Sequence, residues 1–121
     1  MSQSIQDLVQ RYLDGWNETD PARRRALIED TYTKDCTYTD PLASVSTPAG
    51  IDGFIGAVQK QYPGIVFTLS GAVDAHHNQA RFTWHAGAPG AEPAVIGFDV
   101  ALFEDGRIRH VYGFLDKAPP Q

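Results

Sequence analysis

Asp99 is a single acidic residue within the apolar segment AVIGFDVALF, which spans residues 94–103. A carboxylate in an apolar strand lowers stability unless a partner or a proton compensates for its charge. Burial without a nearby cation raises the pKa of a carboxyl group, and the protonated form can donate a hydrogen bond. The segment therefore predicts either a structural carboxylate that is hydrogen-bonded to the backbone, Arg81 or Arg109, or a neutral acid with a functional role.

Two further side chains have types that suit proton chemistry. Asp40 ends a short run of β-forming residues directly before Pro41, where an aspartate either forms a turn or stands at the mouth of a pocket. Tyr12 follows the apolar spacing of an amphipathic helix, where a tyrosine belongs to the core or donates a hydrogen bond to a ligand. Proton abstraction next to a carbonyl needs a carboxylate base, together with donors at the developing oxyanion.

Other reactive residue types show no spacing that is typical of a site. We expect His76 and His77 to diverge within a turn, and we predict no metal and no cofactor. Cys36 has no histidine nearby in the sequence and is interpreted as a small apolar core residue. The basic run ARRRAL, residues 22–27, is interpreted as a solvated helix face.

Composition restricts the class of protein. The chain has 121 residues, of which 42% are hydrophobic and 21% charged, with a net charge of -5, so we expect one domain over residues 1–121. The negative charge argues against nucleic acid as a partner, and no apolar run is long enough to cross a membrane. The first residues lack the pattern of a secretion signal, and the single cysteine fits a reducing compartment, so we expect a cytoplasmic location.

The remaining pattern predicts the elements that position these residues. Helices are expected from Ile5 to Trp16, from Pro21 with Asp20 as its cap and Tyr32 on its apolar stripe, and from Thr47 to the YPG motif. A short strand is expected in CTYTDP, and four longer antiparallel strands near residues 65–73, 80–86, 94–103 and 107–115. This order predicts an α+β fold, in which three N-terminal helices pack on one face of a curved, mostly antiparallel sheet.

The other face of the predicted sheet has no helix to cover it. Side-chain alternation places Ile108 and His110 on that outer face together with apolar residues of the last two strands. A second copy of the chain is the simplest cover, so we predict a homodimer. The apolar residues expected in this interface are Ile96, Phe98, Val100, Tyr112 and Phe114.

Three segments together resemble the nuclear transport factor 2-like superfamily of cone-shaped α+β barrels with a cystatin-like fold. Within it, the chain is similar to ketosteroid isomerases and SnoaL-like polyketide cyclases. VQRYLDGWNETD resembles the first helix of the isomerases, which carries a catalytic tyrosine. YTKDCTYTDP resembles the segment that ends in the catalytic base, and GFDVALFEDGRI resembles the strand with the second oxyanion-hole acid.

The resemblance implies a role for each candidate residue. Asp40 would be the general base, Tyr12 and Asp99 would donate to the oxyanion, and Tyr32 would support Tyr12. The ligand would be small and apolar. The residues expected to line its pocket are Trp16, Tyr32, Phe54, Phe82, Trp84, Val95, Val111 and Leu115.

Three functions are compatible with this resemblance. The first is an isomerase or cyclase that abstracts a proton next to a carbonyl. The second is a non-catalytic domain that binds a small ligand or a protein. The third, an epoxide hydrolase, is disfavoured because Gly97 stands where such an enzyme is expected to have an arginine.

Overall fold

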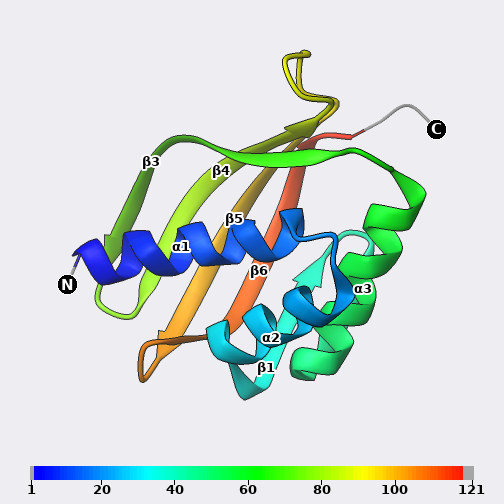
Figure 1. Ribbon diagram of the computed structural model, residues 1–121. Helices are drawn as coiled ribbons and strands as arrows, with labels where there is room; N and C mark the ends of the chain where they lie inside the picture. Colours follow the sequence, from blue (N-terminus) through cyan, green and yellow to red (C-terminus); the bar gives the residue numbers. More distant parts are fainter. Residues whose placement is uncertain (1, 119–121) are drawn as a thin grey trace.

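The computed structural model describes residues 2–118 and shows three helices on one face of a curved sheet (Figure 1). The helices are α1 (Ser2–Asn17), α2 (Pro21–Thr31) and α3 (Thr47–Gln61). This arrangement confirms the α+β fold that the sequence predicts. None of the helices in the described residues is long and apolar enough to cross a membrane.

Helices α2 and α3 begin where the sequence signals place them, whereas α1 begins three residues before the expected Ile5, at Ser2. The side chain of Asp20 accepts a hydrogen bond from the backbone N–H of Arg23, and Pro21 occupies the first turn of α2. The predicted apolar stripe of α1 is buried against the sheet because its members recur at helical spacing. The buried residues of this stripe are Leu8, Val9, Tyr12, Leu13 and Trp16.

Six strands form one mixed sheet in the order β2-β1-β6-β5-β4-β3. Strands β3 to β6 form the predicted antiparallel meander, whereas β1 pairs with β6 in parallel. The Asp105–Gly106 turn between β5 and β6 has both residues at positive φ, as the sequence signal predicts. The strands are β1 (Tyr32–Asp40), β2 (Ala43–Ser46), β3 (Val66–His76), β4 (Gln79–Gly87), β5 (Val95–Glu104) and β6 (Arg107–Lys117).

The predicted extent of the first strand is wrong. Helix α2 ends at Thr31, so Tyr32 begins β1 instead of continuing the helical stripe. The polar residues at 33–35 lack the pattern of a strand. This part of the chain is a strand because it pairs with β6, a contact between residues distant in the sequence. Strand β2 was not predicted, since four residues that pair only with β1 give little periodicity.

Ile108 also lies on the opposite face from the one predicted. Its side chain is buried, whereas His110 lies on the other face as predicted. The pairing of β5 with β6 shifts register between Leu102 and Phe103, and a β-bulge of this kind breaks strict alternation.

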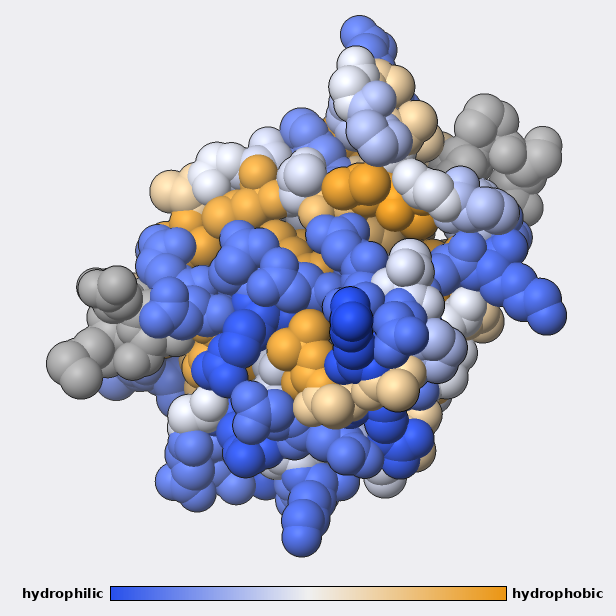
Figure 2. All heavy atoms as spheres, in the orientation of Figure 1, coloured by the Kyte–Doolittle hydropathy of each residue, from blue (hydrophilic) through white to orange (hydrophobic). Residues whose placement is uncertain are grey.

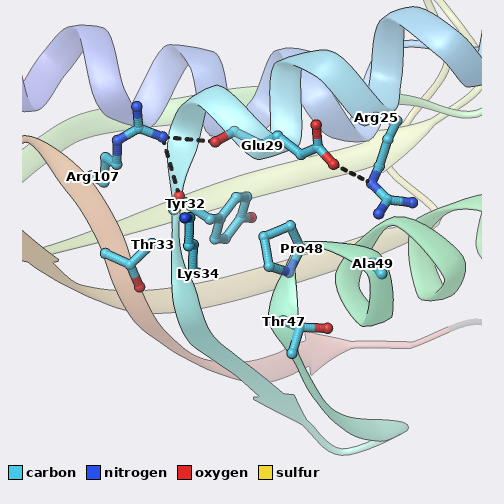
Figure 3. Close-up of a pocket in the computed structure, with 9 residues that line it drawn as sticks. All are labelled: Arg25, Glu29, Tyr32, Thr33, Lys34, Thr47, Pro48, Ala49 and Arg107. Carbon is cyan, nitrogen blue, oxygen red and sulfur yellow. Dashed lines mark hydrogen bonds and ion pairs between the residues drawn. The ribbon is translucent and has the colours of Figure 1, made fainter.

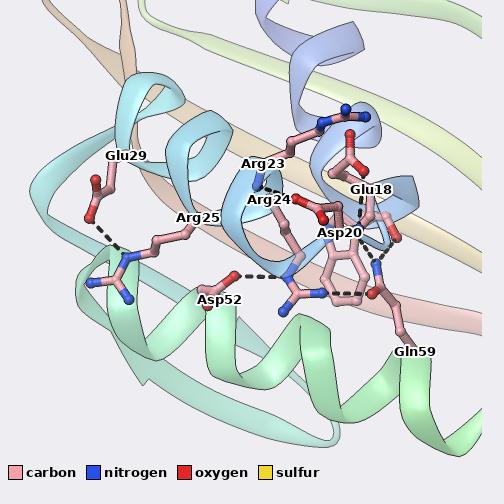
Figure 4. Close-up of polar contacts among 9 residues, drawn as sticks. Glu18, Asp20, Arg23, Arg24, Arg25, Glu29, Asp52 and Gln59 are labelled. Carbon is pink, nitrogen blue, oxygen red and sulfur yellow. Dashed lines mark hydrogen bonds and ion pairs between the residues drawn. The ribbon is translucent and has the colours of Figure 1, made fainter.

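The basic run of α2 is not an entirely solvated face, because Arg24 is buried between α2 and α3 (Figure 4). Its guanidinium group donates to Asp52 and to Gln59, both at 2.8 Å. The amide of Gln59 in turn donates to the backbone carbonyls of Trp16 and Glu18. The network ties α3 to the end of α1, and Arg23 and Arg25 remain exposed as expected.

The sheet face opposite the helices leaves apolar side chains accessible. Phe114 is 58% exposed and Tyr112 is 42% exposed, and Ile96, Phe98 and Val100 are half-buried. On the helical face, by contrast, the outer side of α1 is hydrophilic and apolar surface gathers mainly above it, in the region of β3 (Figure 2).

Candidate active site

Asp99 lies in the middle of β5, where its carboxyl group is buried under α1 with 1% of the residue exposed. The hydroxyl of Tyr12 donates a 2.7 Å hydrogen bond to Oδ2 of Asp99. The indole N–H of Trp84, on the neighbouring strand β4, donates a 2.9 Å hydrogen bond to the same oxygen. Trp84 was expected only as a lining residue, so its hydrogen bond to Asp99 is a contact that the sequence pattern does not reveal.

Burial raises the pKa of Asp99 to about 7. The hydrogen bonds from Tyr12 and Trp84 oppose this rise, the negative charge of Asp40 adds a smaller one, and the pKa of about 7 is the net result. The sequence left open a structural pairing with Arg81 or Arg109. Within residues 2–118 these arginines pair elsewhere, Arg81 with Asp74 and Arg109 with Asp35 and Glu104.

Two glycines make room for this arrangement. A Cβ atom at Gly97 would overlap the ring of Trp84, so glycine allows the indole to lie across β5. A Cβ atom at Gly113 would lie 2.7 Å from Oδ1 of Asp99 and 3.3 Å from Cβ of Asp40. The two candidate acids therefore flank the same glycine of β6.

Asp40 ends β1, and both of its carboxyl oxygens accept hydrogen bonds. Tyr38 donates its hydroxyl to Oδ2 at 2.6 Å, and the backbone N–H groups of Leu42 and Ala43 donate to Oδ1 at 2.8 and 3.0 Å. Asp40 thus forms the turn to β2 and at the same time lines a cavity. No ion pair with Asp40 occurs in the part of the chain that the structure describes.

This cavity, which we call the aromatic cavity, has a volume of about 350 Å³ and opens between α3, the end of α1 and the sheet. That size is at the lower end of the range of small-molecule sites. Five of the expected lining residues border it, namely Trp16, Phe54, Trp84, Val95 and Leu115. It is also lined by Tyr38, Phe67 and Tyr62, which the sequence analysis did not single out.

The other predicted site residues are buried and do not border the aromatic cavity. Tyr12 and Asp99 are buried and do not border the cavity, whereas their partner Trp84 does. Phe82 and Val111 are core residues. The hydroxyl of Tyr32 is buried without a hydrogen-bond partner among the described residues, and its ring centroid lies 6.5 Å from that of Tyr12.

A second, larger and more polar cavity of about 640 Å³ lies near the beginning of β1 (Figure 3). Three of its charged side chains have structural partners. Arg25 pairs with Glu29, and Arg107 donates to the backbone carbonyls of Glu29 and Tyr32. Tyr32 is the only candidate site residue that borders this cavity, so we regard the aromatic cavity as the candidate site.

Histidine and cysteine side chains add no reactive group to this site. His76 and His77 do not diverge as expected, since their Nδ1 atoms lie 3.0 Å apart in the β3–β4 turn. No group of three or more potential metal ligands occurs within residues 2–118. Burial raises the pKa of the Cys36 thiol to about 11, which keeps it protonated at neutral pH.

Comparison with known proteins identifies the class of protein. The profile of the SnoaL-like domain matches residues 9–111. A solved structure from Agrobacterium tumefaciens, described as a proposed isomerase of the SnoaL-like family, has 38% sequence identity and a TM-score of 0.89. The match covers 96% of this chain and 99% of that chain. No significant match was found among curated proteins.

More distant structures share the fold. A proposed ketosteroid isomerase from Kribbella flavida has 19% identity and a TM-score of 0.72, and the match covers 98% of this chain and 84% of that one. A proposed SnoaL-like polyketide cyclase from Jannaschia has 16% identity and a TM-score of 0.76, with 95% and 86% covered. Other matching structures are described as nuclear transport factor 2-like or cystatin-like.

The chain belongs to the SnoaL-like family, and it shares its fold with a structure described as nuclear transport factor 2-like.

Proposed function

We propose that the protein is an enzyme of the ketosteroid isomerase or polyketide cyclase type, which abstracts a proton next to a carbonyl of an apolar ligand. The observation that carries the proposal is the pair of acids on either side of Gly113. Asp99 is buried with a pKa of about 7, whereas Asp40 borders a cavity and accepts three hydrogen bonds. Two carboxyl groups in such different environments can take different roles, the buried one as an acid and the one at the cavity as a base.

In this proposal Asp40 is the general base. Its carboxylate is the one charged side chain among the described residues that line the aromatic cavity. Tyr38 and the backbone of the turn hold the carboxylate in place, so its orientation toward a ligand does not depend on a flexible side chain.

Asp99 and Tyr12 are the proposed donors to the enolate oxygen. Oδ2 of Asp99 already accepts from Tyr12 and Trp84, so a proton on Asp99 would be carried by Oδ1, the oxygen that approaches Gly113. A ligand oxygen that reached this pair once Trp84 moved aside would accept from Oδ1 of Asp99, and from Tyr12 when its hydroxyl turned away from Oδ2 of Asp99. Burial also raises the pKa of Tyr12 well above its ordinary value, which keeps the hydroxyl protonated as a donor.

The position of Trp84 supports a second candidate function. Because Trp84 stands between the aromatic cavity and the Tyr12–Asp99 pair, a domain that binds a small ligand without turnover is also compatible with the geometry. The two functions differ in whether a bound ketone exchanges its α-protons.

Deuterium exchange tests the proposal without knowledge of the natural substrate. A panel of cyclic and aryl ketones is incubated with the protein in deuterated water, and exchange of the α-protons is followed by NMR. We expect the unaltered protein to accelerate exchange for at least one apolar ketone, and Asp40→Asn to reduce that rate by about 10²-fold or more. Asp105→Asn, in the exposed β5–β6 turn, is the matched control and should exchange at the unaltered rate. Binding of the ketones without exchange would favour the non-catalytic domain.

A further inference from the structure

The walls of the aromatic cavity are more aromatic than a general apolar pocket requires. Trp16 contacts the rings of Tyr38, Phe54 and Phe67, with centroids 5.8, 5.8 and 5.1 Å apart. Phe67 continues this set of rings to Trp84 at 5.4 Å. All five residues line the cavity.

Charge in the cavity has one sign only. Asp40 is the sole charged residue among the described residues that line it, and no lysine, arginine or histidine borders it. The whole chain is also negative, with a net charge of -5. A carboxylate or phosphate group in the cavity would therefore lose its hydration and meet no cation in return.

A positive group would find two favourable partners in the same place. Aromatic faces attract cations through their quadrupole, and this attraction grows when water is excluded. The carboxylate of Asp40 supplies the opposite charge, and its position is fixed by three hydrogen bonds. An aromatic wall with a single carboxylate is the composition that recognises alkylated ammonium groups.

We propose that the aromatic cavity binds a compact organic cation, an alkylated or protonated amine carried on a planar apolar group, in preference to a neutral molecule of the same shape. The inference rests on the proposed use of this cavity as the ligand site, and it names the charge of the ligand.

The affinities of three aryl ketones of similar shape distinguish the contribution of charge to binding from that of apolar contact. They are para-acetylphenyltrimethylammonium, its neutral isostere para-tert-butylacetophenone, and the anion para-acetylbenzenesulfonate. The chain has two tryptophans, Trp16 and Trp84, and both line the cavity, so their indole N–H signals in a ¹⁵N-correlated NMR spectrum report binding there. We expect the cation to shift both signals with an affinity about tenfold higher than that of the neutral isostere, and the sulfonate to bind more weakly than either.

Binding of the three ketones to the unaltered protein is sufficient to test the proposal. Equal or tighter binding of the neutral ketone would overturn it, and so would binding of the sulfonate as strong as that of the cation. The readout is binding alone, so a protein that selects the cation but exchanges no α-protons would support this inference while contradicting the proposed catalysis.

Asp40→Asn tests the source of the selectivity. We expect the preference for the cation over the neutral isostere to fall from about tenfold to about threefold, the part that the aromatic faces supply, while the affinity for the isostere stays unchanged. Asp105→Asn removes the same charge from an exposed turn outside the cavity and should keep the full preference. An undiminished preference in Asp40→Asn, or an equal reduction in Asp105→Asn, would overturn the role of Asp40 in charge selection.

Discussion

Gly97 of β5 lies beneath the indole ring of Trp84, its partner residue on β4. Any side chain at Gly97 would overlap that ring. The glycine thereby allows Trp84 to lie across β5 and donate its hydrogen bond to Asp99, two residues further along the strand. One close approach between neighbouring strands thus connects the wall of the aromatic cavity to the buried acid.

Gly97→Ala should therefore displace Trp84 and break its hydrogen bond to Asp99. We expect a loss of about 1–3 kcal/mol in the free energy of unfolding, the usual cost of forcing an added methyl group into a packed site. Urea unfolding measures the change, and the indole N–H signal of Trp84 should move in the NMR spectrum. Gly53→Ala is the control, because a Cβ at this exposed position of α3 meets nothing within 4 Å. That variant should gain about 0.5–1 kcal/mol from helix propensity. Unchanged stability of Gly97→Ala would contradict the packing described.

The raised pKa of Asp99 predicts a specific dependence of stability on pH. In the unfolded chain this carboxyl loses its proton near pH ~3.9, whereas in the folded protein it keeps the proton up to a pH of about 7. Between these values the unfolded state binds fewer protons, so rising pH destabilises the fold, by a total on the order of 4 kcal/mol, and the effect levels off above the folded pKa.

Asp99→Asn should remove this contribution, because the amide carries no charge at any of these pH values. The variant should gain stability relative to the unaltered protein as the pH rises from about 4 to about 7. Urea unfolding at several pH values measures the difference, and the carboxyl carbon of Asp99 gives the pKa directly by NMR. A difference that does not depend on pH, or a pKa near ~3.9, would refute a neutral Asp99.

Arg24→Met should destabilise the protein strongly. The substitution leaves Asp52 without its cation and Gln59 without one of its partners, in an interface where both ionic side chains are largely buried. Removing one member of such a pair costs about 3–5 kcal/mol. Arg25→Met, in the same basic run, removes only an exposed pair with Glu29 and should cost about 1 kcal/mol or less. Similar losses for both variants in thermal or urea unfolding would argue against a special role for Arg24.

Homodimerisation through the outer sheet face stays a prediction. The exposed rings of Tyr112 and Phe114, beside half-buried Ile96 and Phe98, are the surface that a second copy would cover. Sedimentation equilibrium should show a dimer at micromolar concentration, and Phe114→Glu should give a monomer, because a charge on each copy would be buried in the interface. Leu42→Glu replaces another exposed apolar residue, one that borders the aromatic cavity, and should remain dimeric. A monomer in the unaltered protein would refute the prediction.

Local signals in the sequence determined the helices, the antiparallel meander and the candidate acids. Asp20 with Pro21 begins α2, and Asp105 with Gly106 forms the β5–β6 turn, because these effects act between residues close in the chain. The apolar neighbours of Asp99 likewise predicted that its pKa would rise, since burial of a strand follows from its composition.

Contacts between distant residues were decided only by the tertiary structure. The parallel pairing of β1 with β6 extends β1 into a polar segment, and a register shift turns Ile108 into the core. Arg24 looks like any surface arginine in sequence until Asp52 and Gln59 meet it from α3. The indole N–H of Trp84 on β4 donates to Asp99 on the neighbouring strand β5, and Gly97 leaves room for the ring. A sequence pattern indicates whether a residue prefers a buried or an exposed environment. Which distant residue becomes its hydrogen-bond or ion-pair partner depends on how the whole chain folds.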